Sequence, residues 1–134
     1  TNAGLFLAGS YTKSASELAL ASKFVESAAM LESAAAAAPS QSATLYARAA
    51  LMYFRAPKNA DVGRAQIDAD RAIALAPNDA LANFAAGFVL ANQPGKTKDG
   101  LVILNRADEL AKKGNDPALT SNIEDTIKRL GGSK

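Results

Sequence analysis

Alanine is the most frequent residue of this chain and the feature that most constrains its fold. It supplies 31 of the 134 residues. Its side chain combines high helix propensity with a small size that lets packed helices approach closely. β-Branched residues are few beside Ala, Leu, Glu and Lys, which argues against a sheet. The length suits one core, so we expect a single all-α domain over residues 1–134.

Turn residues interrupt the helical periodicity at intervals and predict about seven helices. Pro39, Pro77 and Gly114 end helical segments, and Asp116-Pro117 begins the last one. Ser14 with Glu17 three residues later has the pattern of a capping box, so a helix is expected to begin there. The expected helices span about 3–11, 14–38, 43–55, 62–76, 80–91, 98–112 and 117–130.

The helices form short-looped pairs in which a spacing of large, small and apolar residues recurs. The middle copy consists of Tyr46, Ala49, Ala50, Tyr53, Ala65, Ala69, Ala72 and Pro77. The C-terminal copy consists of Asn83, Ala86, Gly87, Leu90, Gly100, Leu104 and Ala107. An N-terminal copy is laid on Leu5, Ala8, Gly9, Ala21, Val25 and Ala28. This pattern resembles that of the tetratricopeptide repeat family.

The resemblance implies an antiparallel helix-pair right-handed superhelix, that is, an α-solenoid. Its repeats would span about 2–38, 43–79 and 80–114, and a capping helix would span about 117–130. The copies depart from the family pattern in places. Lys112 stands where the last copy should have a proline, and the loop inside the middle copy is longer than usual. An irregular helical bundle with chance alanine spacing is the alternative.

The resemblance also implies where a partner binds, because first helices of the pairs line a concave groove in this family. Side chains there that are not used for packing are Phe6, Ser10, Lys13, Arg48, Leu51, Arg55, Leu81, Phe84 and Phe88, with Ala91 and, at the edge, Phe54. Phe84 and Phe88 are one helical turn apart and share a face. Together with the arginines they fit apolar anchors bordered by groups that select a carboxylate. Alternatively, the rings are core and the arginines are ordinary surface charges.

Family members that bind chaperone tails hold the terminal carboxylate with a Lys and Asn set on successive first helices. The matching positions here carry Phe6 and Ser10 in the first copy, and Leu81 and Ala85 in the third. We therefore expect no binding of chaperone tails.

Composition excludes several kinds of chemistry. The chain has no Cys and no His, so thiol chemistry and the common zinc sites are not expected. The net charge is only +2 with mixed signs, which predicts no nucleic-acid surface and no anionic-membrane surface. No segment predicts membrane insertion. We interpret Gly95-Lys96-Thr97 as a turn, and Asp68-Ala69-Asp70 and Asp108-Glu109 as solvated charge. No enzyme activity, cofactor or metal is expected.

The expected function is that of a non-catalytic interaction module for a protein or peptide partner, within a bacterial assembly or cell-envelope system. One alternative is a self-assembling scaffold, a homo-oligomer formed through the repeat ends. Another is an accessory helical domain of a longer protein. The start at Thr1 without Met suggests a trimmed or processed chain. Cytoplasmic and periplasmic or envelope locations are both open.

Overall fold

The computed structural model describes residues 2–55 and 61–131 and confirms the all-α expectation. No strand occurs within these residues. The seven α-helices are α1 (Asn2–Leu20), α2 (Phe24–Ala37), α3 (Ser42–Arg55), α4 (Val62–Leu75), α5 (Ala80–Ala91), α6 (Thr97–Lys113) and α7 (Pro117–Arg129). A short 3-10 helix, η1 (Pro39–Gln41), precedes α3.

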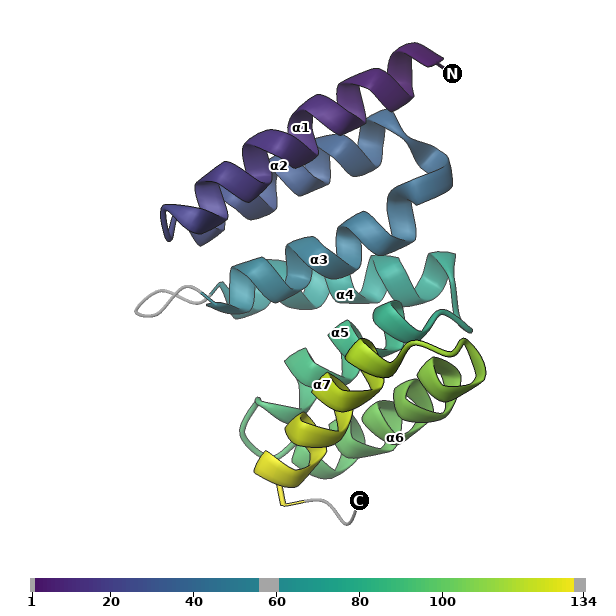
Figure 1. Cartoon of the computed structure of the whole chain (residues 1–134). Helices are drawn as coiled ribbons and strands as arrows, with labels where there is room; N and C mark the ends of the chain where they lie inside the picture. The colour runs from purple at the N-terminus through teal and green to yellow at the C-terminus, as the bar shows by residue number, and fades with distance from the viewer. Residues whose placement is uncertain (1, 56–60, 132–134) are drawn as a thin grey trace.

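The helices stack in chain order in a solenoid-like arrangement (Figure 1). Each helix packs against its neighbours in the sequence, and consecutive helices run antiparallel. The first helices of successive pairs also meet, because α3 packs against α5 and α5 reaches α7. At the N-terminal end the pattern differs, since α1 packs on α2 and makes no extensive contact with α3. Within the described residues, no helix combines the length and the apolar character needed to cross a membrane.

Aspartate side chains begin three of the helices, as expected from the sequence. Each carboxylate accepts a hydrogen bond from the backbone N–H three residues later, which satisfies a donor that has no partner inside the helix. The N-caps are Asp61 on Arg64 (2.9 Å), Asp79 on Ala82 (2.8 Å) and Asp116 on Leu119 (3.0 Å). Asp79 follows Pro77, and Asp116 directly precedes Pro117. Proline and aspartate together therefore set the boundaries at these two positions.

The boundary expected inside the first helix pair is wrong. Helix α1 continues through Ser14 to Leu20, and α2 begins only at Phe24. The turn between them places Ser22 at a φ of 60°. The Ser22 N–H donates to the Ala19 carbonyl (3.0 Å) and the next N–H donates to the Leu18 carbonyl (2.8 Å). This is a Schellman motif formed without glycine, so no residue type marked it in the sequence.

Glycine allows α5 and α6 to pack at unusually short range. A Cβ placed on Gly100 would lie 2.3 Å from the Ala91 backbone nitrogen, and one on Gly87 would lie 2.9 Å from the Leu104 backbone nitrogen. Backbone atoms cannot move aside as a flexible side chain does, so both positions require glycine for this spacing. Gly87 therefore lies at a close helix contact, as its place in the repeat pattern predicted.

We expect Gly100→Ala to destabilise the fold by about 3 kcal/mol or more, because α5 and α6 must move apart to admit the methyl group. The matched control is Gly9→Ala in α1, where an added Cβ meets nothing within 4 Å. Since alanine has the higher helix propensity, the control should gain roughly 0.5–1 kcal/mol. Urea unfolding followed by circular dichroism measures both values. Equal stability of the two variants would contradict this packing.

Candidate partner-binding face

Three phenylalanines contributed by α3 and α5 form a contiguous aromatic cluster. The Phe54 and Phe88 rings meet edge to face, with centroids 5.4 Å apart and an interplanar angle of 78°. The Phe84 and Phe88 centroids are 5.8 Å apart. Both arrangements suit the quadrupoles of aromatic rings. All three rings are half-buried, so each contributes to packing and also presents an edge to solvent.

Two arginines lie over phenylalanine rings, one over a ring of this cluster and one over Phe24 at the start of α2. The Arg55 guanidinium lies 4.9 Å from the ring centroid of Phe24, and that of Arg129 lies 5.8 Å from the centroid of Phe88. These distances are within the range of cation–π attraction. Both arginines are exposed. The four rings and two guanidiniums are contributed by α2, α3, α5 and α7. We call these six residues the aromatic row: Phe24, Phe54, Phe84, Phe88, Arg55 and Arg129.

The charge of the aromatic row is not balanced by neighbouring acids. Among the described residues, no carboxylate oxygen lies within 4.0 Å of Arg55 or Arg129. Arg48, two helical turns before Arg55 on the same face of α3, likewise has no such carboxylate in the described part of the chain. The face therefore combines apolar ring edges with guanidinium groups that have N–H donors left to offer.

Periodicity within each helix explains how these side chains come together. Phe84 and Phe88 are four residues apart, so they lie one above the other on α5. Phe84 packs toward the core beneath α6 and α7, whereas Phe54, Leu51 and Leu81 pack against the alanine-rich core of the first five helices. The sequence left open whether the phenylalanines are core or surface. In the structure Phe54 and Phe84 pack against the core and remain partly exposed, whereas Phe88 is half-buried and packs against these two rings.

The structure divides the expected groove residues into two groups. Arg55, Phe84 and Phe88 belong to the aromatic row, and Arg48, Leu51 and Leu81 are half-buried on the same two helices. The other three, Phe6, Ser10 and Lys13, are exposed on α1, where the Phe6 side chain is 79% exposed. Because α1 does not pack along α3, the structure does not bring this second group to the row.

Sequence reasoning missed Phe24 and Arg129. Phe24 was placed within a helix expected to run from Ser14 to Ala38, whereas it is the first residue of α2. Arg129 is the last residue of α7, and its contact with Phe88 depends on how that helix packs. No local pattern marks either contact.

Two acidic residues expected at the surface are buried. Asp68 and Asp108 both have fully buried side chains. Asp108 forms an ion pair with Lys112 (3.1 Å), and Lys112 forms a second ion pair with Glu124 of α7 (3.0 Å). Hydrogen bonds to Glu124 and then to Asp108 raise the pKa of Lys112. The lysine thus joins α6 to α7, and the interpretation of these aspartates as solvated charge is wrong.

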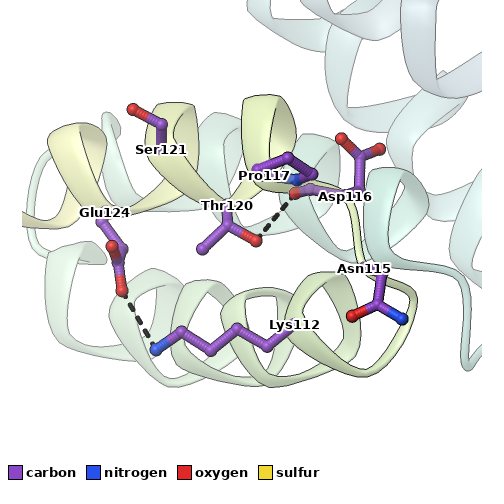
Figure 2. A pocket seen from close by; sticks show the side chains of 7 residues that line it. All are labelled: Lys112, Asn115, Asp116, Pro117, Thr120, Ser121 and Glu124. Carbon is purple, nitrogen blue, oxygen red and sulfur yellow. Dashed lines mark hydrogen bonds and ion pairs between the residues drawn. The ribbon is translucent and has the colours of Figure 1, made fainter.

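A hollow of about 530 Å³ lies between the ends of α6 and α7, and its lining residues are Lys112, Asn115, Asp116, Pro117, Thr120, Ser121 and Glu124 (Figure 2). Lys112 pairs with Glu124 across it, and Thr120 Oγ1 donates to the Asp116 carbonyl (2.8 Å). The Lys112–Glu124 pair connects α6 to α7, whereas the Thr120 bond lies within the first turn of α7. Within the described residues, no group of three or more acidic side chains is placed to hold a metal ion.

Comparison of the chain with protein-family models, with curated proteins and with solved structures finds no match.

We expect Phe88→Ala to cost about 2–3 kcal/mol of unfolding free energy, because Phe88 contacts Phe54, Phe84 and Arg129. Phe6→Ala is the control, and its exposed ring predicts a change within about 0.5 kcal/mol. Chemical unfolding of both variants gives the comparison. A Phe88→Ala variant as stable as the control would show that the row does not contribute to packing.

Proposed function

We propose that this chain is a tetratricopeptide-like, non-catalytic interaction module that binds an acidic segment of a protein partner on the aromatic row. The observation that carries the proposal is the pair of exposed guanidiniums, Arg55 and Arg129, each of which lies over a half-buried phenylalanine ring.

The chemistry of the row favours a segment that has an apolar side chain between carboxylates. Ring edges of Phe54, Phe84 and Phe88 offer apolar contact to a Leu or Phe of the partner. A guanidinium held over a ring has lost part of its rotational freedom, so less entropy is lost when it binds a carboxylate. Its planar set of N–H donors matches a carboxylate in bidentate geometry. Arg48 extends the positive charge along α3.

The repeat architecture supports the choice of this face. The row lies mainly on α3, α5 and α7, which are the first helices of the later pairs and of the capping position. In the family that the repeat pattern resembles, first helices line the concave binding surface.

Fluorescence polarisation with labelled synthetic peptides tests the proposal. Three peptides carry one central Phe flanked by Asp and Glu, by Lys and Arg, or by Ser. We expect the acidic peptide to bind best, with an affinity that falls as salt is added. The double variant Arg55→Glu plus Arg129→Glu should weaken acidic-peptide binding by about tenfold or more and should improve binding of the basic peptide.

The matched control changes the same amount of charge elsewhere. Lys98 and Lys113 are exposed on α6, and replacing both by Glu should leave acidic-peptide binding nearly unchanged. An equal loss in both double variants would mean that only the overall charge matters. Equal binding of all three peptides to the unmodified protein would also contradict the proposal.

A second candidate function is self-assembly through the N-terminal helix. The first turns of α1 expose Leu5 (45%), Phe6 (79%) and Leu7 (49%), and Leu20 at its other end is 88% exposed. A second copy of the chain is the occupant that this helix would take, because end-to-end stacking buries the terminal helix of a solenoid. Light scattering over a wide concentration range decides, and a monomer at every concentration rules it out.

A further inference from the structure

A fully buried carboxyl group, Asp68, lies where α2, α3 and α4 come together. Its Oδ1 atom is 3.4 Å from Arg71 Nη1. Its Oδ2 atom is also buried, and no donor of the described residues makes a hydrogen bond to it. Beside it Glu32 of α2 accepts a hydrogen bond from the Tyr53 hydroxyl of α3 (2.7 Å). Asp68 and Glu32 interact directly as neighbouring carboxyl groups.

A proton on Asp68 removes the unfavourable features of this arrangement, which are the charge repulsion, the lost solvation and the unsatisfied Oδ2 atom. Two adjacent carboxylates repel one another, and a buried carboxylate lacks the solvation that stabilises its charge. If Oδ2 carries a hydrogen, it becomes a donor to Glu32 and is no longer unsatisfied. Burial first, and then Glu32, raise the pKa of Asp68 to about 8. Burial and the bond to Glu32 also raise the pKa of Tyr53 to about 12, so its hydroxyl stays a donor.

The charged groups that face this pair come from each helix packed around it. Glu32 faces it from α2 and Tyr53 from α3, while Arg64 and Arg71 are contributed by α4 itself. Both arginines lower the pKa of Asp68, but their side chains are 60% and 54% exposed. Arg64 also pairs with Asp61 (3.4 Å). The exposed guanidiniums therefore compensate only in part for the burial of Asp68.

We propose that Asp68 and Glu32 share one proton, and that this proton holds α2 to α4 as a pH-sensitive joint between the first and second helix pairs. Both helices pack on α3, yet they make no extensive contact with one another. A hollow of about 370 Å³ separates them, lined by Ala29, Glu32, Tyr53, Arg64, Ile67 and Arg71. The shared proton is thus a direct connection between two helices that otherwise meet mainly through α3.

The direction of the pH dependence follows from linkage. The pKa of Asp68 is about 8 in the folded chain, above the ordinary value of 3.8. The folded state therefore holds the proton more tightly than the unfolded state does. Its stabilising contribution is complete below about pH 4 and is lost progressively as pH rises to about 8. This is the reverse of an aspartate whose pKa is lowered on folding, because here burial and Glu32 outweigh the ion pair with Arg71.

Urea unfolding between pH 5 and pH 9 tests the joint with three proteins. Asp68→Asn keeps an N–H donor toward Glu32 but cannot ionise. The unfolding equilibrium constant of the wild type, relative to that of this variant, should rise by about tenfold or more over the range. Asp70→Asn is the matched control, because Asp70 is exposed on the same helix and accepts from Gln66 (2.8 Å). It should follow the wild type. Parallel curves for the wild type and Asp68→Asn would overturn the proposal.

Two measurements on the wild type keep the proposal testable if Asp68→Asn does not fold. The side-chain carboxyl carbon of Asp68 should titrate above pH 7 by carbon-13 NMR, and titration below pH 5 would overturn the shared proton. Amide hydrogen exchange, corrected for its intrinsic pH dependence, should show α1 and α2 losing protection before α5 and α6 as pH rises. Equal loss throughout would contradict a local joint.

Discussion

Close approach of helix backbones is the constraint on which the rest of this structure depends. Gly100 lies against Ala91, and alanines fill most of the interior. Interfaces of this kind have no room for large rings. Accordingly, none of the five phenylalanines is fully buried in the described chain, and Tyr53 is the only aromatic residue there that is. Three of the phenylalanine rings gather instead on α3 and α5, the first helices of the later pairs. The aromatic row is thus a consequence of the alanine core as well as a candidate binding face.

An alanine interior has a second consequence, which concerns register. Helix faces made of similar small side chains offer little shape to fix how far one helix slides along another. Buried polar groups supply directional bonds that do. Ser27 of α2 donates to the Ala15 carbonyl of α1 (2.7 Å), and Ser42 of α3 donates to the Ala35 carbonyl of α2 (2.8 Å). Each bond is satisfied in one alignment only. Asp68 belongs to the same set but differs in needing a proton to be satisfied.

Local signals in the sequence predicted those parts of the fold that depend on local physics. Aspartate caps and prolines marked the ends of α4, α5 and α7, and the four-residue spacing of Phe84 and Phe88 predicted their common face. The turn at Ser22 was missed because its backbone bonds need no special residue. The burial of Asp68 was missed because an Asp-Ala-Asp sequence places two carboxylates on different faces of a helix, and only packing decides which face is covered. The contact of Arg129 with Phe88 is tertiary as well.

Helix α2 contributes a residue to the aromatic row and a residue to the buried carboxyl pair. The Arg55 guanidinium lies over the ring of its first residue, Phe24. Two helical turns later, Glu32 faces Asp68. A helix is stiff over so short a distance, so a shift of α2 against α3 and α4 changes both contacts together. On the proposed binding mode, a partner that holds Phe24 and Arg55 in place would also hold Glu32 beside Asp68. Because coupling between two binding events is reciprocal, the proton shared by Asp68 and Glu32 would in turn favour the arrangement of Phe24 and Arg55 to which the partner binds.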